Sequence, residues 1–205
     1  MSIFHYFSED PNKRAKFIFN LIAPVYNYID TLLQSSYLEA IDVLSDELEI
    51  ENKTVLDIGT GTGAWAVKFE QKKAKQITGV DFSDKMLNVS QKKHQTIHFL
   101  KANAEDLTQI KDNTYDIVTA SYVLHGVKED RRNIILSEMK RVSKNYVVLH
   151  DFMGTTPYFI RFLEFMEKSD YKFFKKNITN ELQNLFTNYK AIEIKGGSGL
   201  YICKV

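Results

Sequence analysis

The sequence predicts an α/β fold in which a doubly wound, mostly parallel sheet carries helices on both faces. Three observations support this prediction. Over residues 54–65, TVLDIGTGTGAW, a buried strand runs into a glycine-rich turn and then into the start of a helix near Ala64. Strand-like and helical segments then alternate, as they do in parallel sheets. At the end of the sequence, KAIEIK and LYICKV flank GGSG, which predicts an antiparallel hairpin.

The elements are expected in the following order. Two or three helices lie between Pro11 and Leu48, and Pro24 interrupts their pattern. Parallel strands are predicted near 54–58, 76–80, 96–100, 115–120 and 145–150. Helices are predicted over 83–93, with Ser83 as N-cap, and over 129–143. Thr156 and Pro157 are expected to open one more helix before the hairpin.

Composition indicates one compact domain. The chain has 205 residues, 44% hydrophobic and 26% charged, with a formal net charge of +1. This charge balance gives no general attraction to nucleic acid or to anionic membranes. One cysteine forms no internal disulfide and favours a cytoplasmic location. The beginning of the sequence has no long apolar run, so neither a signal peptide nor a membrane insertion is expected.

No repeat or linker divides the sequence, so residues 1–205 are interpreted as a single domain. Residues 1–50 are expected to form a helical N-terminal cap, and residues 151–188 the helices on the substrate side. No His/Cys cluster has metal-ligand spacing, so no metal is predicted.

The glycine turn predicts a nucleotide-cofactor site. Gly59, Gly61 and Gly63 depart from the G-x-G-x-x-G spacing of dinucleotide-binding proteins. Asp57 would repel phosphate and attract the ammonium group of an amino-acid ligand. Asp81 follows the next strand, where a carboxylate could accept hydrogen bonds from both ribose hydroxyls. A nucleoside with a zwitterionic tail therefore fits best, and S-adenosylmethionine is that molecule.

Five motifs in order resemble class I S-adenosylmethionine-dependent methyltransferases. They are Val55 to Gly63, Gly79 to Leu87, Asn103 to Leu107, Tyr115 to Val127 and Glu138 to Ser143. The resemblance implies a Rossmann-like methyltransferase fold, with a seven-stranded sheet that ends in the hairpin. The segment IFNLIAPVYNYIDTLL, 18–33, is similar to the N-terminal helices of the ubiquinone and menaquinone C-methyltransferases. His125-Gly126 stands where those enzymes carry Arg-Asn, which leaves quinone specificity open.

The resemblance also suggests further cofactor contacts. Asn103 and the Ala104 backbone would read the adenine edge, and Tyr26 would close over the sulfonium, although a tyrosine among apolar residues can equally be core. Phe82 and Met86 would pack on the adenine face or, alternatively, in the core. Ser121 follows strand four at the carboxyl edge, where open α/β sheets bind ligands.

The catalytic prediction is a general base, if one is needed at all. Methyl transfer is an in-line displacement, so alignment and desolvation supply much of the rate. His125 is the first candidate because it follows strand four and can titrate near neutrality. His150 and Asp151, at the end of strand five, come second. The alternative for His125 is a loop residue that orders the site.

The acceptor is predicted to be a small, partly apolar or aromatic molecule. The segment 158–174, YFIRFLEFMEKSDYKFF, is rich in aromatics and follows strand five, where a substrate lid often lies. Nucleic-acid methylation is disfavoured because no Asn/Asp-Pro-Pro-Tyr run follows strand four. Two alternatives remain open: a non-catalytic S-adenosylmethionine-binding subunit and, less favoured, an NAD-dependent oxidoreductase. Oligomeric state is not predicted.

Overall fold

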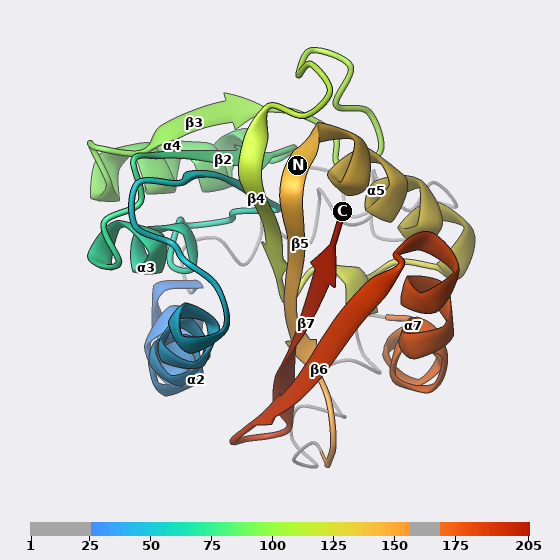
Figure 1. Cartoon of the computed structure of the whole chain (residues 1–205). Helices are drawn as coiled ribbons and strands as arrows, with labels where there is room; N and C mark the ends of the chain where they lie inside the picture. Colours follow the sequence, from blue (N-terminus) through green and yellow to red (C-terminus); the bar gives the residue numbers. More distant parts are fainter. Residues whose placement is uncertain (1–25, 156–168) are drawn as a thin grey trace, which may run out of the picture.

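A computed structural model describes residues 26–155 and 169–205 of the chain, with side chains from residue 33 onward. Its strands are β1 (Thr54–Ile58), β2 (Gln76–Asp81), β3 (His98–Lys101), β4 (Tyr115–Ser121), β5 (Ser143–Phe152), β6 (Asn188–Ile194) and β7 (Ser198–Lys204). They form one seven-stranded sheet in the order β3-β2-β1-β4-β5-β7-β6 (Figure 1). The first five strands are parallel, and β7 is antiparallel to both β5 and β6. The predicted fold class is confirmed.

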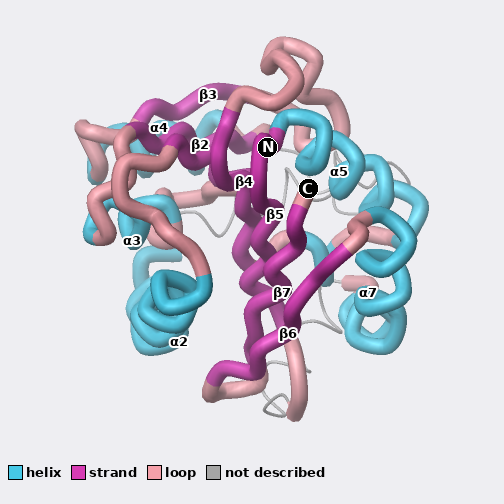
Figure 2. Tube along the Cα trace, in the orientation of Figure 1, coloured by secondary structure: helices cyan, strands magenta, loops and turns pink. Residues whose placement is uncertain are grey.

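Helices cover both faces of this sheet. They are α2 (Tyr26–Glu47), α3 (Ala66–Gln71), α4 (Asp84–Lys93), the 3-10 turn η2 (Leu124–Gly126), α5 (Glu129–Val142) and α7 (Tyr171–Leu185). In Figures 1 and 2, α2 and α3 lie on one side of the central strands, and α5 and α7 lie on the other. The short α4 packs on β2 and β3.

Each face of the sheet has its own apolar core because side chains alternate along a strand. In β1, Leu56 and Ile58 join the core under α5 and α7, whereas Val55 joins the core under α2 and α3. In β5, Leu149 belongs to the first core and Val148 to the second. The next pair in β5, His150 and Asp151, continues this alternation to opposite faces, which decides the chemistry described below.

Most predicted boundaries agree with the structure, and the differences have local causes. Ser83 is the N-cap of α4, and its Oγ accepts a hydrogen bond from the Met86 amide at 3.3 Å. Helix α3 begins at Ala66 rather than near Ala64, because the chain is still turning after Gly63, whose φ is 82°. Strand β5 runs on to Phe152 because β7 pairs with its last residues.

The C-terminal hairpin is confirmed. Gly196 and Gly197 both have a φ of 82° in the turn between β6 and β7, where side chains other than glycine are strained. The helix expected at Thr156 and Pro157 and the break at Pro24 lie outside the described residues. Among the helices that the structure does describe, none has the length and apolar character needed to span a membrane.

Candidate active site

The glycine turn after β1 approaches the neighbouring strands so closely that side chains would collide. Gly59, Gly61 and Gly63 have φ values of 66°, 55° and 82°, all in the left-handed region. A Cβ on Gly59 would lie 2.6 Å from a methyl carbon of Val123, in the loop after β4. The Thr60 amide donates to the Val80 carbonyl at 2.9 Å and holds the turn against β2. The turn therefore links the ends of β1, β2 and β4.

Asp57, directly before this turn, carries an unpaired buried carboxylate. The residue is 1% exposed, and neither carboxylate oxygen has a hydrogen-bond partner. The buried hydroxyl of Thr60 also has none, and these are the only such side-chain atoms within the described ranges. Burial raises the pKa of Asp57 to about 7; the neighbouring Thr60 hydroxyl reduces this rise, and the Asp81 carboxylate adds to it. A buried carboxylate without a donor is costly, so the site favours a ligand that brings a donor or a cation.

Asp81 ends β2 and faces the same turn. Its Oδ2 accepts from the Gly61 amide at 3.0 Å, and its Oδ1 accepts from the Ser83 amide at 2.8 Å. Burial raises the pKa of this carboxyl as well. A carboxylate has about four lone-pair sites, and the Phe82 amide is a third donor, so Asp81 retains capacity for a further donor. The two hydroxyls of a ribose are donors of that kind.

The other predicted cofactor residues occupy different environments. Met86 is 2% exposed, so its side chain is core in this structure, whereas Phe82 and Ala104 are half-buried. Asn103 is exposed, and its Oδ1 accepts from the Glu105 amide at 3.2 Å, which fixes the loop after β3. Tyr26 is the first residue of α2, and its side chain lies outside the described part.

His125 and Asp151 form a hydrogen-bonded pair on the face covered by α5 and α7. His125 Nδ1 lies 2.7 Å from Asp151 Oδ1, and both residues are buried. Asp151 also accepts from the backbone amides of Leu124 (3.1 Å), His125 (3.3 Å) and Phe152 (2.8 Å). A carboxylate that accepts three amides acts as an acceptor toward the ring too, so Nδ1 carries the proton and Nε2 the lone pair.

His150 lies on the opposite face, under α2, in a network of hydroxyl groups. Its Nδ1 is 3.0 Å from Ser121 Oγ, and its Nε2 is 3.1 Å from Ser36 Oγ. Ser36 Oγ also lies 3.1 Å from the Tyr122 hydroxyl and 3.0 Å from Ser198 Oγ. Complete burial lowers the pKa of His150 to about 4, so the ring is neutral at physiological pH.

The structure therefore divides the predicted catalytic residues. His125 and Asp151 are brought together, whereas His150 is enclosed with Ser121 and has hydroxyl partners at both ring nitrogens. Ser121, expected at the cofactor, has its hydroxyl directed to this buried network. Sequence reasoning missed Ser36 and Tyr122, since a serine inside a helix carries no sign of a partner 114 residues away. Tyr122 has a φ of 52°, which only the folded chain reveals.

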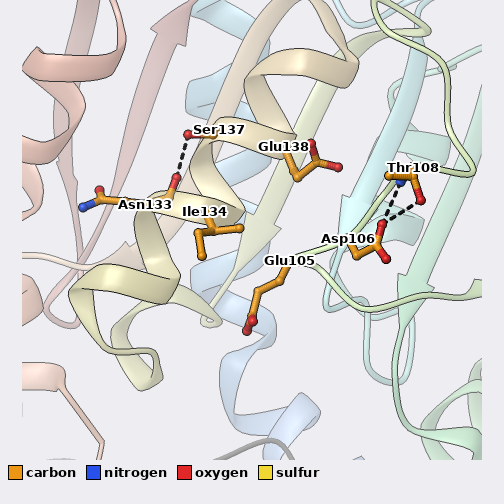
Figure 3. A pocket seen from close by; sticks show the side chains of 7 residues that line it. All are labelled: Glu105, Asp106, Thr108, Asn133, Ile134, Ser137 and Glu138. Carbon is orange, nitrogen blue, oxygen red and sulfur yellow. Dashed lines mark hydrogen bonds between the residues drawn. The ribbon is translucent and has the colours of Figure 1, made fainter.

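A surface groove of about 410 Å³ lies between the loop after β3 and α5 (Figure 3). Glu105, Asp106, Thr108, Asn133, Ile134, Ser137 and Glu138 line it. Its carboxylates already have partners: Glu105 pairs with Arg131, Glu138 with Arg141, and Asp106 accepts from Thr108. The groove contains none of the predicted catalytic residues.

Comparison with known proteins finds a match to one protein family. The methyltransferase domain family matches residues 55–145, from β1 into the start of β5. This matched segment, less than half of the 205 residues, is similar to that family. With the strand order of the sheet, this match confirms the resemblance to class I S-adenosylmethionine-dependent methyltransferases.

Relatives of this domain include the demethylmenaquinone methyltransferase of Thermotoga maritima, 30% identical over 64% of this chain and 58% of its own length. The ubiquinone/menaquinone biosynthesis C-methyltransferase UbiE of Campylobacter jejuni is 35% identical over 61% of this chain and 57% of its own. The chain thus spans less than two thirds of these curated relatives. Among solved structures, the DhpI–SAH complex has a TM-score of 0.71 at 17% identity, covering 92% of this chain and 93% of DhpI, and shares the fold.

Proposed function

We propose that the protein is an S-adenosylmethionine-dependent methyltransferase that acts on a small-molecule acceptor. The unpaired, buried carboxylate of Asp57 beneath the glycine turn is the observation that carries this proposal. An ammonium group supplies both the cation and the donors that this carboxylate lacks. A phosphate group would add a second negative charge there, so the site speaks against a nicotinamide dinucleotide.

The residues of the site suit the parts of this cofactor. Asp57 would hold the ammonium, and Asp81 the ribose hydroxyls. A Cβ on Gly61 would meet nothing closer than 4.0 Å, so this glycine leaves space for the cofactor to approach the backbone, whereas Gly59 is needed because of its contact with Val123. The bound cofactor supplies an activated methyl group on sulfur. The protein contributes alignment and the exclusion of water, which lower the barrier to an in-line displacement.

His125 and Asp151 are the proposed proton-accepting pair. Asp151 fixes the His125 ring through Nδ1 and stabilises the imidazolium that forms when Nε2 takes a proton. Such a pair is useful when the acceptor carries a weakly acidic proton, as a phenol or a hydroquinone does. The names of two relatives refer to quinones, and a hydroquinone is the reduced form of a quinone, so we extend this class of acceptor to the chain as a proposal.

An aromatic acceptor pocket also remains a proposal. Tyr171 belongs to the aromatic segment 158–174, but it is 6% exposed and its ring centroid lies 5.0 Å from that of Phe152, so it is part of the core. Phe162 and Phe165 lie outside the described residues. The cytoplasmic location and the absence of nucleic-acid partners likewise remain predictions from composition.

Calorimetric titration with S-adenosylmethionine, S-adenosylhomocysteine and NADH tests the function. Asp81→Ala removes two hydrogen bonds to a charged group, so we expect affinity for the first two to fall at least about 30-fold. Asp84→Ala is the matched control, because Asp84 is an exposed carboxylate at the start of α4, three residues after Asp81, and pairs with Lys101. Its affinity should stay within about twofold of wild type.

Tight binding of NADH, or no binding of either methionine nucleoside, would overturn the proposal in favour of an oxidoreductase. A non-catalytic cofactor-binding subunit is the second candidate function. It would bind S-adenosylmethionine normally but fail to methylate any quinol, phenol or amine. Turnover with one of these acceptors eliminates it.

A further inference from the structure

Arg132, in α5, is a fully buried cation with no part in the proposed cofactor site or in the proton-accepting pair. Its side chain is 0% exposed. One edge of the guanidinium faces Glu181 of α7: Nε donates to Oε2 and Nη2 to Oε1, each at 2.7 Å. This two-point geometry is specific to arginine and fixes the plane of the guanidinium group.

The third nitrogen of Arg132 reaches the turn that carries His125. Nη1 donates to the carbonyl oxygen of Val127 and lies 3.4 Å from that of Leu124. These two carbonyls flank His125 in the sequence, one residue before it and two after. Nη1 also contacts Asp170, at the start of α7, at 3.3 Å. The guanidinium thus joins η2 to both α5 and α7.

Asp151 binds the N–H groups of the same turn, whereas Arg132 binds its carbonyl groups. It accepts the amides of Leu124 and His125, whereas Arg132 donates to the carbonyls of Leu124 and Val127. The His125 turn is therefore fixed between an anion that binds its N–H groups and a cation that binds its C=O groups. This arrangement determines where the imidazole stands relative to Asp151.

Stability alone is a weak reason for such a pair. A buried ion pair gives little net stability over apolar residues of similar size, because both charges lose their hydration. Apolar residues could fill the space between α5 and α7, but they could not donate to two carbonyls. Orientation of the His125 turn is what the ion pair supplies and a hydrophobic contact does not.

We propose that Arg132 and Glu181 are positioning residues that hold the His125 ring in register with Asp151. The structural part of this proposal concerns the turn itself. The catalytic part, that misplacement of the ring slows methyl transfer, rests on the function proposed above. The two parts are tested with separate measurements.

Arg141 provides a matched control in the same helix. Its guanidinium pairs with Glu138 through Nε and Nη2 at 2.7 and 2.8 Å. It also donates to two backbone carbonyls, those of Ile110 and Leu107, each at 2.9 Å. Arg141 therefore makes hydrogen bonds of the same kind as Arg132 at the other end of α5, away from η2, with a side chain that is 28% exposed. Arg132→Lys and Arg141→Lys each keep the charge and remove the fork.

The first measurement does not depend on activity. In nitrogen-15-labelled protein, the Nδ1–H proton of His125 reports the hydrogen bond to Asp151, and the amides of Leu124 and His125 report the turn. We expect Arg132→Lys to shift or broaden the Nδ1–H signal and to reduce protection of both amides from hydrogen exchange by about tenfold, equivalent to one lost hydrogen bond. Arg141→Lys should leave all three signals as in wild type.

Glu181→Gln is the second variant, because it keeps the size of the side chain and removes only the charge that orients Arg132. It should produce the same changes even if Arg132→Lys fails to fold, which circular dichroism would show. Wild-type His125 and Leu124 signals in a folded Arg132→Lys or Glu181→Gln protein would overturn the proposal. Equal changes in Arg141→Lys would also overturn it, since they would indicate a general effect of loosening α5.

The second measurement is methyl transfer. We expect Arg132→Lys to lower kcat by about 10- to 100-fold through misplacement of the base, with an unchanged KM for S-adenosylmethionine. Normal kcat together with changed His125 signals would remove the catalytic part of the proposal. If no chain, wild type included, transfers methyl groups, the proposed function fails, and the nuclear magnetic resonance result still decides the role of Arg132.

Discussion

His150 and His125 lie at the same edge of the sheet but on opposite faces of it. His150 is under α2, enclosed by hydroxyl groups and by the ring of Trp65, 5.1 Å away between ring centroids. His125 is under α5 and α7 and is bound to the carboxylate of Asp151. Asp151 directly follows His150 in β5, so the side-chain alternation of a single strand separates the two environments.

The difference shows that burial alone does not decide what a histidine can do. Hydroxyl groups satisfy both nitrogens of His150 without favouring its charged form, and burial then lowers its pKa to about 4. A carboxylate partner, by contrast, fixes the tautomer of His125 and stabilises a proton taken up at Nε2. We therefore assign the proposed proton transfer to His125 and a structural role to His150.

The largest expected effect is the loss of turnover in His125→Asn. Removing a general base costs about 100- to 10,000-fold in rate, so kcat should fall in that range. Affinity for S-adenosylmethionine should stay within about twofold, because Asp57 and Asp81 are unchanged. Stopped assays with saturating acceptor would measure the first quantity and calorimetry the second.

Tyr122→Phe is the control, because its hydroxyl belongs to the His150 network and its ring stays in place. A fall in kcat equal to that of His125→Asn would abolish the distinction between the two faces. An unchanged kcat in His125→Asn would show that the acceptor reacts without a base.

The fold was predictable because its signals are local. Glycine residues with positive φ must follow β1, Ser83 caps α4, and GGSG joins the hairpin strands, so each element is encoded within a few residues. The end of β5 was placed too early, at residue 150 instead of Phe152, because pairing with β7 extends it. Pairing between distant strands is not encoded in either segment alone.

The candidate site was predictable where one motif contains it and unpredictable where it depends on distant partners. Asp57, Gly59 and Gly61 fall within five consecutive residues and can be interpreted together. His150 and Asp151 were proposed as a pair of candidates, because a sequence does not say on which face each side chain lies until the strand is placed. Arg132 and Glu181, 49 residues apart, gave no sign of their contact.

The second expected effect concerns the free energy of unfolding. Asp57 and His150, both on the α2 face, should make it depend on pH in opposite directions. Asp57 has a folded pKa of about 7, above its ordinary value of 3.8, so the folded state binds the extra proton. Its contribution to stability is complete below pH 3.8 and is lost as pH rises through 7, by up to about 4 kcal/mol. Asp57→Asn keeps a neutral side chain at all pH values. The variant should therefore gain stability over wild type as pH rises from 4 to 8.

The pKa of His150 is shifted in the opposite direction, downward. Its folded pKa of about 4 lies below its ordinary value of 6.5, so the unfolded state binds the extra proton. Its contribution is complete above pH 6.5 and is lost as pH falls through 4, by up to about 3 kcal/mol. In wild type the two effects partly cancel between pH 4 and 6.5. Urea unfolding of wild type, Asp57→Asn and His150→Gln at several pH values separates them.

Subtracting the wild-type curve of unfolding free energy against pH removes the contributions of all the other titrating groups. The free energy of unfolding of Asp57→Asn minus that of wild type should rise as pH rises. The same difference for His150→Gln should rise as pH falls. Two flat differences would mean that neither side chain is as buried during titration as it is in this structure. Asp57→Asn should also weaken binding of S-adenosylmethionine, which would make Asp57 a residue kept for binding at a cost in stability.

The smallest expected effect concerns the hydroxyl that ties α2 to the sheet edge. Ser36 Oγ contacts His150, Tyr122 and Ser198 at 3.0 to 3.1 Å, and the site is only partly buried, so water can replace some of these contacts. Ser36→Ala should lower the free energy of unfolding by about 1 kcal/mol. Thermal or urea unfolding would measure it, with Ser35→Ala as the control. Ser35 is exposed in the same helix, and alanine there should be neutral or slightly stabilising.

The effect of Ser36→Ala on turnover decides how independent the two faces are. If His150 and its hydroxyl partners only fasten α2, kcat should stay within about twofold of wild type once the folded fraction is corrected for. A larger loss at unchanged cofactor affinity would mean that the network reaches the His125 face through Tyr122, whose ring lies 6.4 Å from that of His125. A double mutant with His125→Asn would then show changes in activation free energy that do not add, whereas independent faces give additive changes.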